Sequence, residues 1–298
     1  MVNLIMYKTK DICKITGLRI DKLNGDIAFN EEAHKYWSVE DGIFYSSVTG
    51  MISSYNKPYD SIMWSKYKTL QNEFPQYYKK VNKLEREVRV DEARKLMLPE
   101  ELEQLDILSE NLRTVWSQEA QDAIDWGHKV HKEKELQLLK LKEENIPVSF
   151  NHLIENIYFN VTTDIDEFLS KGNFCFPEML LYSKKFKISG QADLVLKTED
   201  DFFFIIDYKT NKEITFNNRY QKLLPPLDDL DSCKYNSYSI QLNSYAFLLK
   251  EMFPHLKFFR AAIFHFPKIG QPEMIFCSDY SNRMLGLMQH FYLKRQIF

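Results

Sequence analysis

The chain has 298 residues, of which 44% are hydrophobic and 27% charged, and this composition excludes a disordered chain, a collagen-like chain and a disulfide-stabilised mini-protein. Its formal charge of −3 shows no global basic excess that would announce a nucleic-acid partner. The four cysteines form no CxxC pair, so we expect reduced thiols in a cytoplasmic protein, with no iron–sulfur cluster. An apolar leader and a run of 18 apolar residues are both absent from the sequence, so we expect neither secretion nor a membrane span.

The first half of the chain predicts a small hairpin region followed by helices. Short alternating runs over 27–29, 34–39 and 43–45, with turn glycines at Gly25 and Gly42, predict the hairpins. A helix is expected over 47–55, and several more over 60–115 with breaks at Pro75 and Pro99. A long helix over 117–144 and a shorter one over 152–169 follow.

Beyond residue 172 the pattern changes to strands. Strands are expected over 178–186, 188–196, 202–208, 257–266 and 274–277, with helices over 239–252 and 281–296. This order predicts an α/β fold in which a central mixed sheet is flanked by helices. We expect residues 1–115 to form an N-terminal hairpin and helical region, and residues 116–298 to form the core.

Two acids and a lysine lie on neighbouring strands of this expected sheet. Gly190-Gln-Ala-Asp193 is on one strand, and the next strand ends in Asp207-Tyr-Lys209-Thr. Asp207 and Lys209 are two residues apart, so they point to the same face, and a hairpin can bring Asp193 opposite them. Three ionisable groups beside an apolar run are costly to bury unless they are paired or bind a cation, and Mg²⁺ prefers carboxylate oxygens. An Asp–Lys salt bridge on a solvent-facing strand is the alternative; the Gly190 motif and the apolar strand favour a metal site.

These segments resemble the PD-(D/E)xK nuclease superfamily, in particular its RecB-like exonuclease branch of phage-type and mitochondrial enzymes. That branch has a G-x-x-D strand and then D-x-K followed by Thr or Ser. Gly127-His-Lys-Val-His131 is similar to its helix motif, and Gln241-Leu-Asn-Ser-Tyr245 to its Q-L-x-x-Y helix. Ala192 stands where the superfamily has a proline before the first acid. The resemblance covers about residues 120–265 and implies a restriction-endonuclease-like core with an N-terminal, mostly helical elaboration.

The resemblance also implies roles for the acids and the lysine. Asp193 and Asp207 would ligate Mg²⁺ or Mn²⁺, with the Tyr208 carbonyl as a backbone ligand. Lys209 would act on the attacking water and stabilise the charge that develops on the phosphate. Glu178, which opens the preceding strand, is as consistent with a surface acid as with a metal ligand.

Three further residues gain roles in the same way. His131 would contact the metal or a phosphate; the alternative is a partly buried histidine with a satisfied partner. Gln241 and Tyr245 share one helix face and would lie beside Lys209 and the scissile phosphate. Ordinary core packing is the alternative for Tyr245, and less so for Gln241, whose amide needs a partner when buried.

The N-terminal part suggests a path for DNA. Residues 34–36, 46–49 and 57–60 are similar to the opening of phage-encoded and mitochondrial RecB-like exonucleases, which implies that Ser47 and Thr49 cap a helix and contact a phosphate. A helix cap alone is the alternative. Residues 57–95 carry ten Lys or Arg against six acids, whereas 96–125 carry one Arg against eight acids. The near-neutral total therefore does not exclude DNA, and we expect contact along the basic stretch. Its candidate DNA-binding residues are Lys57, Trp64, Lys66 and Lys68, unless this is a solvated helical face with buried aromatics.

Taken together, the residues and the resemblance predict a metal-dependent nuclease that hydrolyses phosphodiester bonds at DNA ends or in single strands. Its setting would be recombination, repair or other DNA processing, in a bacterial host cell if the chain is phage-encoded, with a recombination or replication protein as a possible partner. The alternatives are a structure-specific or restriction-type endonuclease and a non-catalytic DNA-binding recombination partner.

Overall fold

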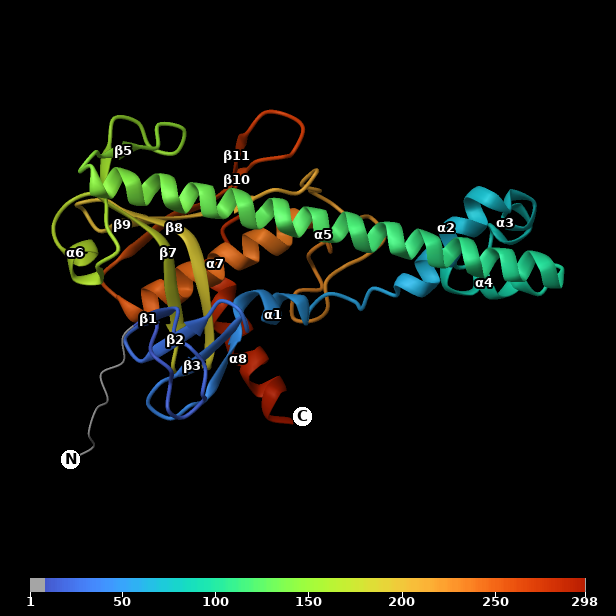
Figure 1. The fold of residues 1–298 in the computed structure, drawn as a ribbon, viewed down its shortest axis with the longest axis horizontal. Coiled ribbons are helices and arrows are strands. Elements are labelled where there is room, and N and C mark those ends of the chain that lie inside the picture. The colour runs from blue at the N-terminus through green and yellow to red at the C-terminus, as the bar shows by residue number, and fades with distance from the viewer. Residues whose placement is uncertain (1–8, 298) are drawn as a thin grey trace. The chain divides into compact units, whose positions relative to one another are not determined.

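The computed structural model describes residues 9–297, which form two compact units (Figure 1). The first unit comprises residues 9–57 and 128–297, and the second comprises residues 58–127. Helix α5 (Pro99–Glu143) belongs to the second unit in its first part and to the first unit from His128 on. Among residues 9–297, no helix is both long and apolar enough to cross a membrane.

The first unit is built on a mixed sheet. Its strands are β1 (Lys22–Asn24), β2 (Ile27–Asn30), β3 (Lys35–Ser38), β4 (Phe44–Ser47), β5 (Val148–Ser149), β6 (Tyr158–Val161), β7 (Phe174–Ser183), β8 (Ile188–Lys197), β9 (Phe202–Lys209), β10 (Lys257–His265) and β11 (Glu273–Phe276). Its own helices are α1 (Val48–Ser53), α6 (Ile165–Leu169), α7 (Lys234–Met252) and α8 (Ser281–Ile297). The predicted α/β fold, a curled mixed sheet flanked by helices, is confirmed.

Strand β8 is the centre of this sheet. One edge of β8 pairs antiparallel with β7 over nearly its whole length. Its other edge is shared: Ile188 and Ser189 pair with β4, whereas residues 194–197 pair with β9. β9 continues the sheet through a parallel pair with β10, in which Lys209 lies opposite His265. The sheet therefore divides beside β8, and residues 190–193 lie at the division.

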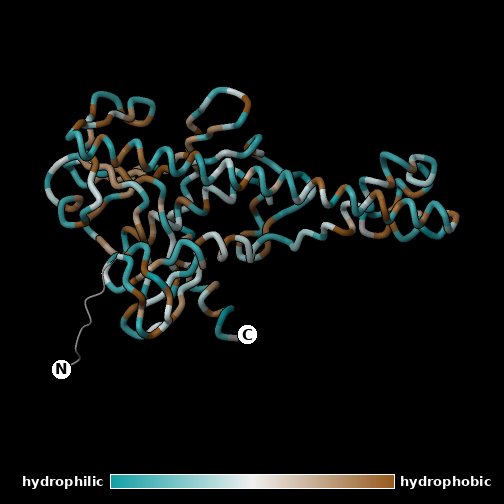
Figure 2. The backbone as a smooth tube through the Cα atoms, in the orientation of Figure 1, coloured by the Kyte–Doolittle hydropathy of each residue, from teal (hydrophilic) through white to brown (hydrophobic). Residues whose placement is uncertain are grey.

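Apolar side chains cover both faces of the sheet. One face packs against α1, α7 and α8 in the largest buried cluster, which includes Val48, Ile205, Leu242 and Met288. The other face packs against α5 through residues such as Leu138, Leu194 and Ile206. Figure 2 shows the hydrophobic residues along these central strands and the hydrophilic ones in the outer loops. The sheet is thus buried on both sides, which makes any charged group at the division costly unless it is paired.

The structure corrects two expected helices. The segment 152–169, expected to be one helix, is strand β6 followed by the short helix α6, because Asp164 caps α6 and residues 160–161 pair with β7. Helices begin at Pro75 and Pro99, where breaks are expected, but the helix expected over 117–144 is not separate from the one before it, since α5 continues from Pro99 to Glu143. Helix α7 begins five residues before the expected start at 239.

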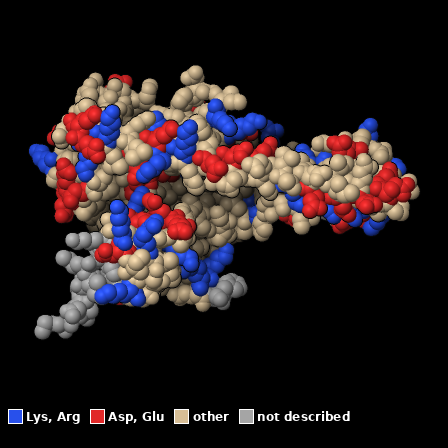
Figure 3. Space-filling model, in the orientation of Figure 1, with Lys and Arg blue, Asp and Glu red and all other residues tan. Residues whose placement is uncertain are grey.

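The second unit is helical, with α2 (Ser61–Glu73), α3 (Pro75–Val81), α4 (Arg86–Arg94) and the start of α5. Leu70, Phe74, Ala93 and Leu105 form its core. Its basic and acidic stretches are paired with each other, since the Lys66 and Arg94 side chains lie 2.9 and 2.8 Å from Asp106. Figure 3 shows Lys and Arg side chains interspersed with Asp and Glu on its surface.

Candidate active site

The G-x-x-D segment occupies the division of the sheet. The last paired residues of β8 and β9 are Leu194 and Ile206, so Asp193 and Asp207 are the next residues of the two strands. The strands separate there, and the backbone N–H of Tyr208 donates to Asp193 Oδ2 at 2.6 Å instead of to a strand carbonyl. The two acids therefore lie side by side where strand pairing ends, and one oxygen of Asp193 accepts a hydrogen bond from the backbone.

Glu178 lies on the other side of Asp193. Pro177 pairs with Leu194 and Met179 with Ala192, which places Glu178 opposite Asp193 in the same register. The backbone of Glu178 is left-handed, with φ of 55°, and the side chains of β7 change face at this point: Phe174 belongs to the α7 side before it and Met179 after it. A non-glycine residue in this conformation is strained, and when it lies inside a strand rather than in a turn it is a candidate for a functional position. The change of face lets the Glu178 carboxylate join Asp193.

His131 completes a cluster of three potential metal ligands. It lies on α5, and its Nδ1 is 3.3 Å from Asp193 Oδ1. One ligand atom from each of His131, Glu178 and Asp193 lies within 4.8 Å of the others. Asp207 is not in this group; its role as a ligand, like that of the Tyr208 carbonyl, stays a prediction.

Crowding shifts the pKa values of these groups. Burial and the Asp193 charge raise the pKa of Glu178 to about 7. Burial and Asp193 also raise the pKa of Asp207 to about 6. For His131, burial lowers the pKa, but the hydrogen bond and charge of Asp193 outweigh it and bring it to about 9. Carboxylates that repel one another in a buried site are stabilised by a cation, which here is a protonated side chain or a metal ion.

Lys209 and Gln241 hold Asp207 from two sides. The Lys209 ammonium forms an ion pair with Asp207 Oδ2, a buried oxygen that has no other partner among the described residues. The Gln241 amide donates to Asp207 Oδ1 at 3.4 Å and to the Tyr245 hydroxyl at 3.0 Å. Burial lowers the pKa of Lys209, but the charges of Asp207 and Asp193 raise it by more, so the net pKa is above its usual value and the ammonium stays charged. Gln241 and Tyr245 are therefore near the acid, on one face of α7, as the spacing indicates.

Gly190 makes this arrangement of α7 possible. A Cβ at Gly190 would lie 2.6 Å from Cε1 of Tyr245, a distance that real Cβ atoms do not show. The missing side chain lets the Tyr245 ring lie against β8, where it supports Gln241. This close approach is the physical reason for a glycine three residues before Asp193.

An aromatic ring supports the Lys209 side chain. Its ammonium lies 4.7 Å from the centroid of the Tyr238 ring, and the Tyr238 hydroxyl donates to the Asn211 side chain. The backbone carbonyl of Asn211 in turn lies 2.8 Å from Nε2 of His265, the residue opposite Lys209 in the sheet. Cation–π contact and this hydrogen-bonded support restrict the position of the ammonium.

One comparison with known protein families agrees with this geometry. A family model described as the PD-(D/E)XK nuclease superfamily matches residues 74–282, more than half of the chain. The chain belongs to the PD-(D/E)XK nuclease superfamily. A solved structure titled "Crystal structure of SSO0001" is similar over 62% of this chain and 68% of its own, at 13% identity and a TM-score of 0.28. No curated protein matches the sequence.

Membership indicates a metal-dependent nuclease that acts on DNA, and nucleases of this superfamily use divalent metals. The side chains present fit such an ion, because oxygen ligands from Glu178 and Asp193 converge with an imidazole nitrogen. The left-handed Glu178 backbone, which turns its carboxylate toward Asp193 and His131, points the same way.

Sequence reasoning did not identify two side chains beside Glu178 in this nuclease. The Lys22 ammonium of β1 lies 3.3 Å from Glu178 Oε2, and the Gln191 amide donates to the same oxygen. Gln191 lies inside the G-x-x-D motif, and this position near Asp193 could have marked it as a site residue. Lys22 has no sequence signal, since it is 156 residues from Glu178.

The candidate DNA contacts of the N-terminal part have mixed surroundings. Ser47 caps α1, with its Oγ accepting from Gly50 N at 2.9 Å, whereas Thr49 is a helical residue that donates to Ser47 rather than a cap. Lys66 is paired with Asp106, and Lys68 donates to Gln71. The Trp64 ring lies against Tyr67 and under Arg86. Contact of these residues and Lys57 with DNA stays a prediction.

Proposed function

We propose that this nuclease is an exonuclease of the RecB-like branch, which hydrolyses phosphodiester bonds at DNA ends or in single strands during recombination, repair or other DNA processing. One observation carries the proposal: Gln241, from the helix that the branch shares, donates to Asp207, the first acid of the D-x-K pair. Supporting it, Tyr245 of the same helix packs against the G-x-x-D strand.

Each side chain then has a chemical task. Asp193, Glu178 and His131 hold a divalent ion, Mg²⁺ or Mn²⁺, and Asp207 lies beside them. The bound ion supplies Lewis-acid stabilisation of the phosphate charge. Lys209 orients the attacking water and places a positive charge at the reacting phosphate. Gln241 and Lys209 keep the Asp207 carboxylate in position through their contacts with its two oxygens.

The test compares linear and circular DNA. End-labelled single- and double-stranded linear DNA and a closed circle are incubated with the protein and Mg²⁺, in parallel with Lys209→Ala and a matched Lys257→Ala control. Lys257 begins β10 at the opposite end of the sheet, where it lies over Phe202. We expect the parent and Lys257→Ala to degrade linear DNA alone and Lys209→Ala to be inactive.

The other outcomes reject the proposal in different ways. Cutting of the closed circle would identify an endonuclease. DNA binding without metal-dependent cleavage of any substrate would identify a non-catalytic binding protein. Equal cleavage by Lys209→Ala and the parent would show that Lys209 does not take part in hydrolysis.

A further inference from the structure

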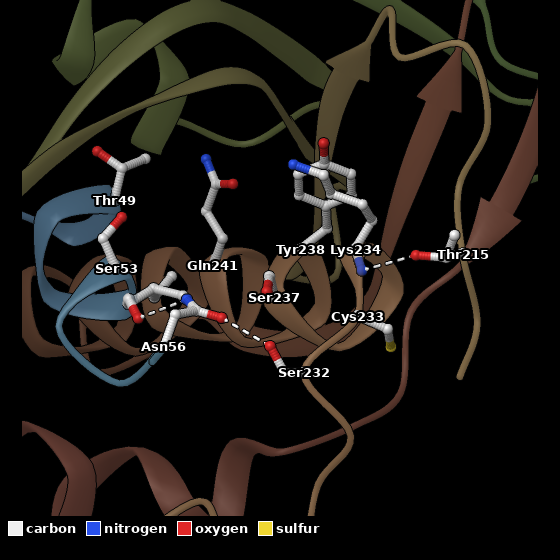
Figure 4. A pocket seen from close by; sticks show the side chains of 11 residues that line it. Thr49, Ser53, Asn56, Thr215, Ser232, Cys233, Lys234, Ser237, Tyr238 and Gln241 are labelled. Carbon is white, nitrogen blue, oxygen red and sulfur yellow. Dashed lines mark hydrogen bonds between the residues drawn. The ribbon is translucent and has the colours of Figure 1, made fainter. Parts of the chain in front are cut away.

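A pocket with a mixed polar and apolar lining lies between α1 and the first turns of α7 (Figure 4), and two of its lining residues, Gln241 and Tyr238, contact Asp207 and Lys209. Its volume is about 440 Å³, within the range of about 300–1,000 Å³ that is usual for small-molecule sites. The residues that matter for its chemistry are Ser53, Asn56, Lys234, Ser237, Tyr238 and Gln241. The pocket is therefore large enough to take a ligand and is lined by hydrogen-bonding groups.

The pocket continues the site already described. Gln241 lines it and donates to Asp207, and Tyr238 lines it while its ring supports Lys209. A molecule in the pocket would consequently lie next to the groups that act on the scissile phosphate. In Figure 4 the Thr49 and Gln241 side chains extend the same way from α1 and α7.

The charge of the lining suits an anion. It includes the ammonium of Lys234 and no carboxylate. Over residues 9–297, Lys234 has no ion pair, and the hydroxyls of Ser53 and Ser237 have no hydrogen-bond partner. A phosphate group needs hydrogen-bond donors that are not already paired with a carboxylate, and the sugar oxygens beside it need hydroxyl partners. The Lys234 ammonium and the two serine hydroxyls meet these needs.

Lys234 also stands in a position that folding does not favour. It is the first residue of α7, whose first turn has no acidic residue. A cation at a helix N-terminus is repelled by the positive end of the helix dipole. The backbone N–H groups of Lys234 and Tyr235 donate to Thr215 at 3.2 and 3.0 Å, so they are not available to a ligand. A ligand at this end of α7 would therefore be bound by side chains. A residue placed against local preference points to a functional cause.

We propose that this pocket binds the nucleotide next to the bond that is cut. Lys234 contacts its phosphate, and the hydroxyls of Ser53 and Ser237 contact phosphate or sugar oxygens. This inference rests on the proposed function, since it assigns a second subsite on the same DNA strand. Its recognition is of the backbone, so it does not depend on base sequence.

The first test measures binding alone. A fluorescent single-stranded oligonucleotide is titrated with the Lys209→Ala protein in Ca²⁺ over a series of salt concentrations, with and without Lys234→Gln or Lys250→Gln. Lys250 is a matched control because it is exposed in the last turn of the same helix. We expect Lys234→Gln to weaken binding about tenfold and to reduce the slope of log Kd against log salt by about 0.7. Its melting temperature should be unchanged or slightly higher, because a charge that the helix dipole disfavours is removed.

The second test locates the contact. Single phosphates of the substrate are replaced by neutral methylphosphonates, and cutting by the active protein is mapped. The replacement beside the cut bond should slow cutting about tenfold in the parent and much less in Lys234→Gln, because the two changes remove the same contact.

The outcomes separate the two proposals. Unchanged Kd and salt slope in Lys234→Gln, or an equal loss in Lys250→Gln, overturn the pocket even when the parent cleaves DNA. Absence of cleavage by the parent overturns the proposed function, while the binding titration still reports on Lys234. If the Lys209→Ala protein with Lys234 intact does not bind single-stranded DNA, the assignment of the pocket as a nucleotide site is rejected as well.

Discussion

A single methyl group at Gly190 should disturb both the fold and the site. The Cβ of Gly190→Ala would lie 2.6 Å from Cε1 of Tyr245 and 3.3 Å from Cγ2 of Val48. Neither neighbour can yield easily, since Tyr245 is 3% exposed and Val48 fully buried. Any shift of the Tyr245 ring also moves its hydroxyl, to which the Gln241 amide donates, and so displaces Gln241 from Asp207.

The expected magnitude follows from this overlap. Overpacking of a well-filled core costs about 1–3 kcal/mol, which lowers the melting temperature by about 2–4 °C per kcal/mol in a domain of this size class. The turnover rate should fall in the same variant, because the support of Asp207 is lost together with the packing.

Urea unfolding and single-turnover cleavage measure the two effects. Gly286→Ala is the matched control, because a Cβ at Gly286 in α8 meets no atom within 4 Å, and alanine stabilises a helix interior by about 0.5–1 kcal/mol. Tyr245→Leu should relieve the overlap, so that the double variant is more stable than the sum of its two single changes by about 0.5–3 kcal/mol. If Gly190→Ala matches the parent in stability and turnover, or if the two changes are additive, the close approach of Tyr245 is not the reason for the glycine.

Three further predictions concern the charged groups. Tyr238→Leu should lower the turnover rate about tenfold at saturating DNA by releasing Lys209, whereas Tyr238→Phe keeps the ring and should lose less; equal loss in both would assign the effect to the hydroxyl. Gln241→Leu should reduce turnover and destabilise the protein by about 1–3 kcal/mol, because a similar volume is kept while a buried Asp207 oxygen and the Tyr245 hydroxyl lose their partner; a stability loss with unchanged turnover would make Gln241 structural. Mg²⁺ or Mn²⁺ at about a hundred times its dissociation constant should stabilise the parent by about 2.7 kcal/mol, and EDTA should reverse this. Asp193→Asn should abolish most of that stabilisation, and an unchanged shift would place the ion elsewhere.

The strands that carry the acids were predictable because their signals are local. An apolar run ending in Asp207 and Lys209 predicts a buried strand with two charged groups on one face, and the structure has both at the end of β9. The spacing of Gln241 and Tyr245 likewise places them on one face of α7. The roles assigned to these residues stay predictions, whereas the superfamily is shown by the family model.

The errors arose where long-range pairing decides. Residues 158–161 contain Asn160 and Val161, which pair with β7, and that pairing overrides the helical pattern read over 152–169. The helix expected to start at 117 is instead the second part of α5, because residue 116 and its neighbours include no proline or glycine that would end the helix that begins at Pro99. The pairing of basic and acidic stretches through Asp106 also depends on contacts between helices.

The sequence by itself determined the superfamily motifs, the α/β class and the identity of the acids and the lysine, because each depends on residues a few positions apart. Only the tertiary structure decided how they are used. The division of the sheet beside β8 brings Asp193 next to Asp207, the left-handed Glu178 turns a third carboxylate toward His131, and β1 delivers Lys22 to that carboxylate. These contacts join segments far apart in the chain, and their geometry is set by strand register and packing rather than by local spacing.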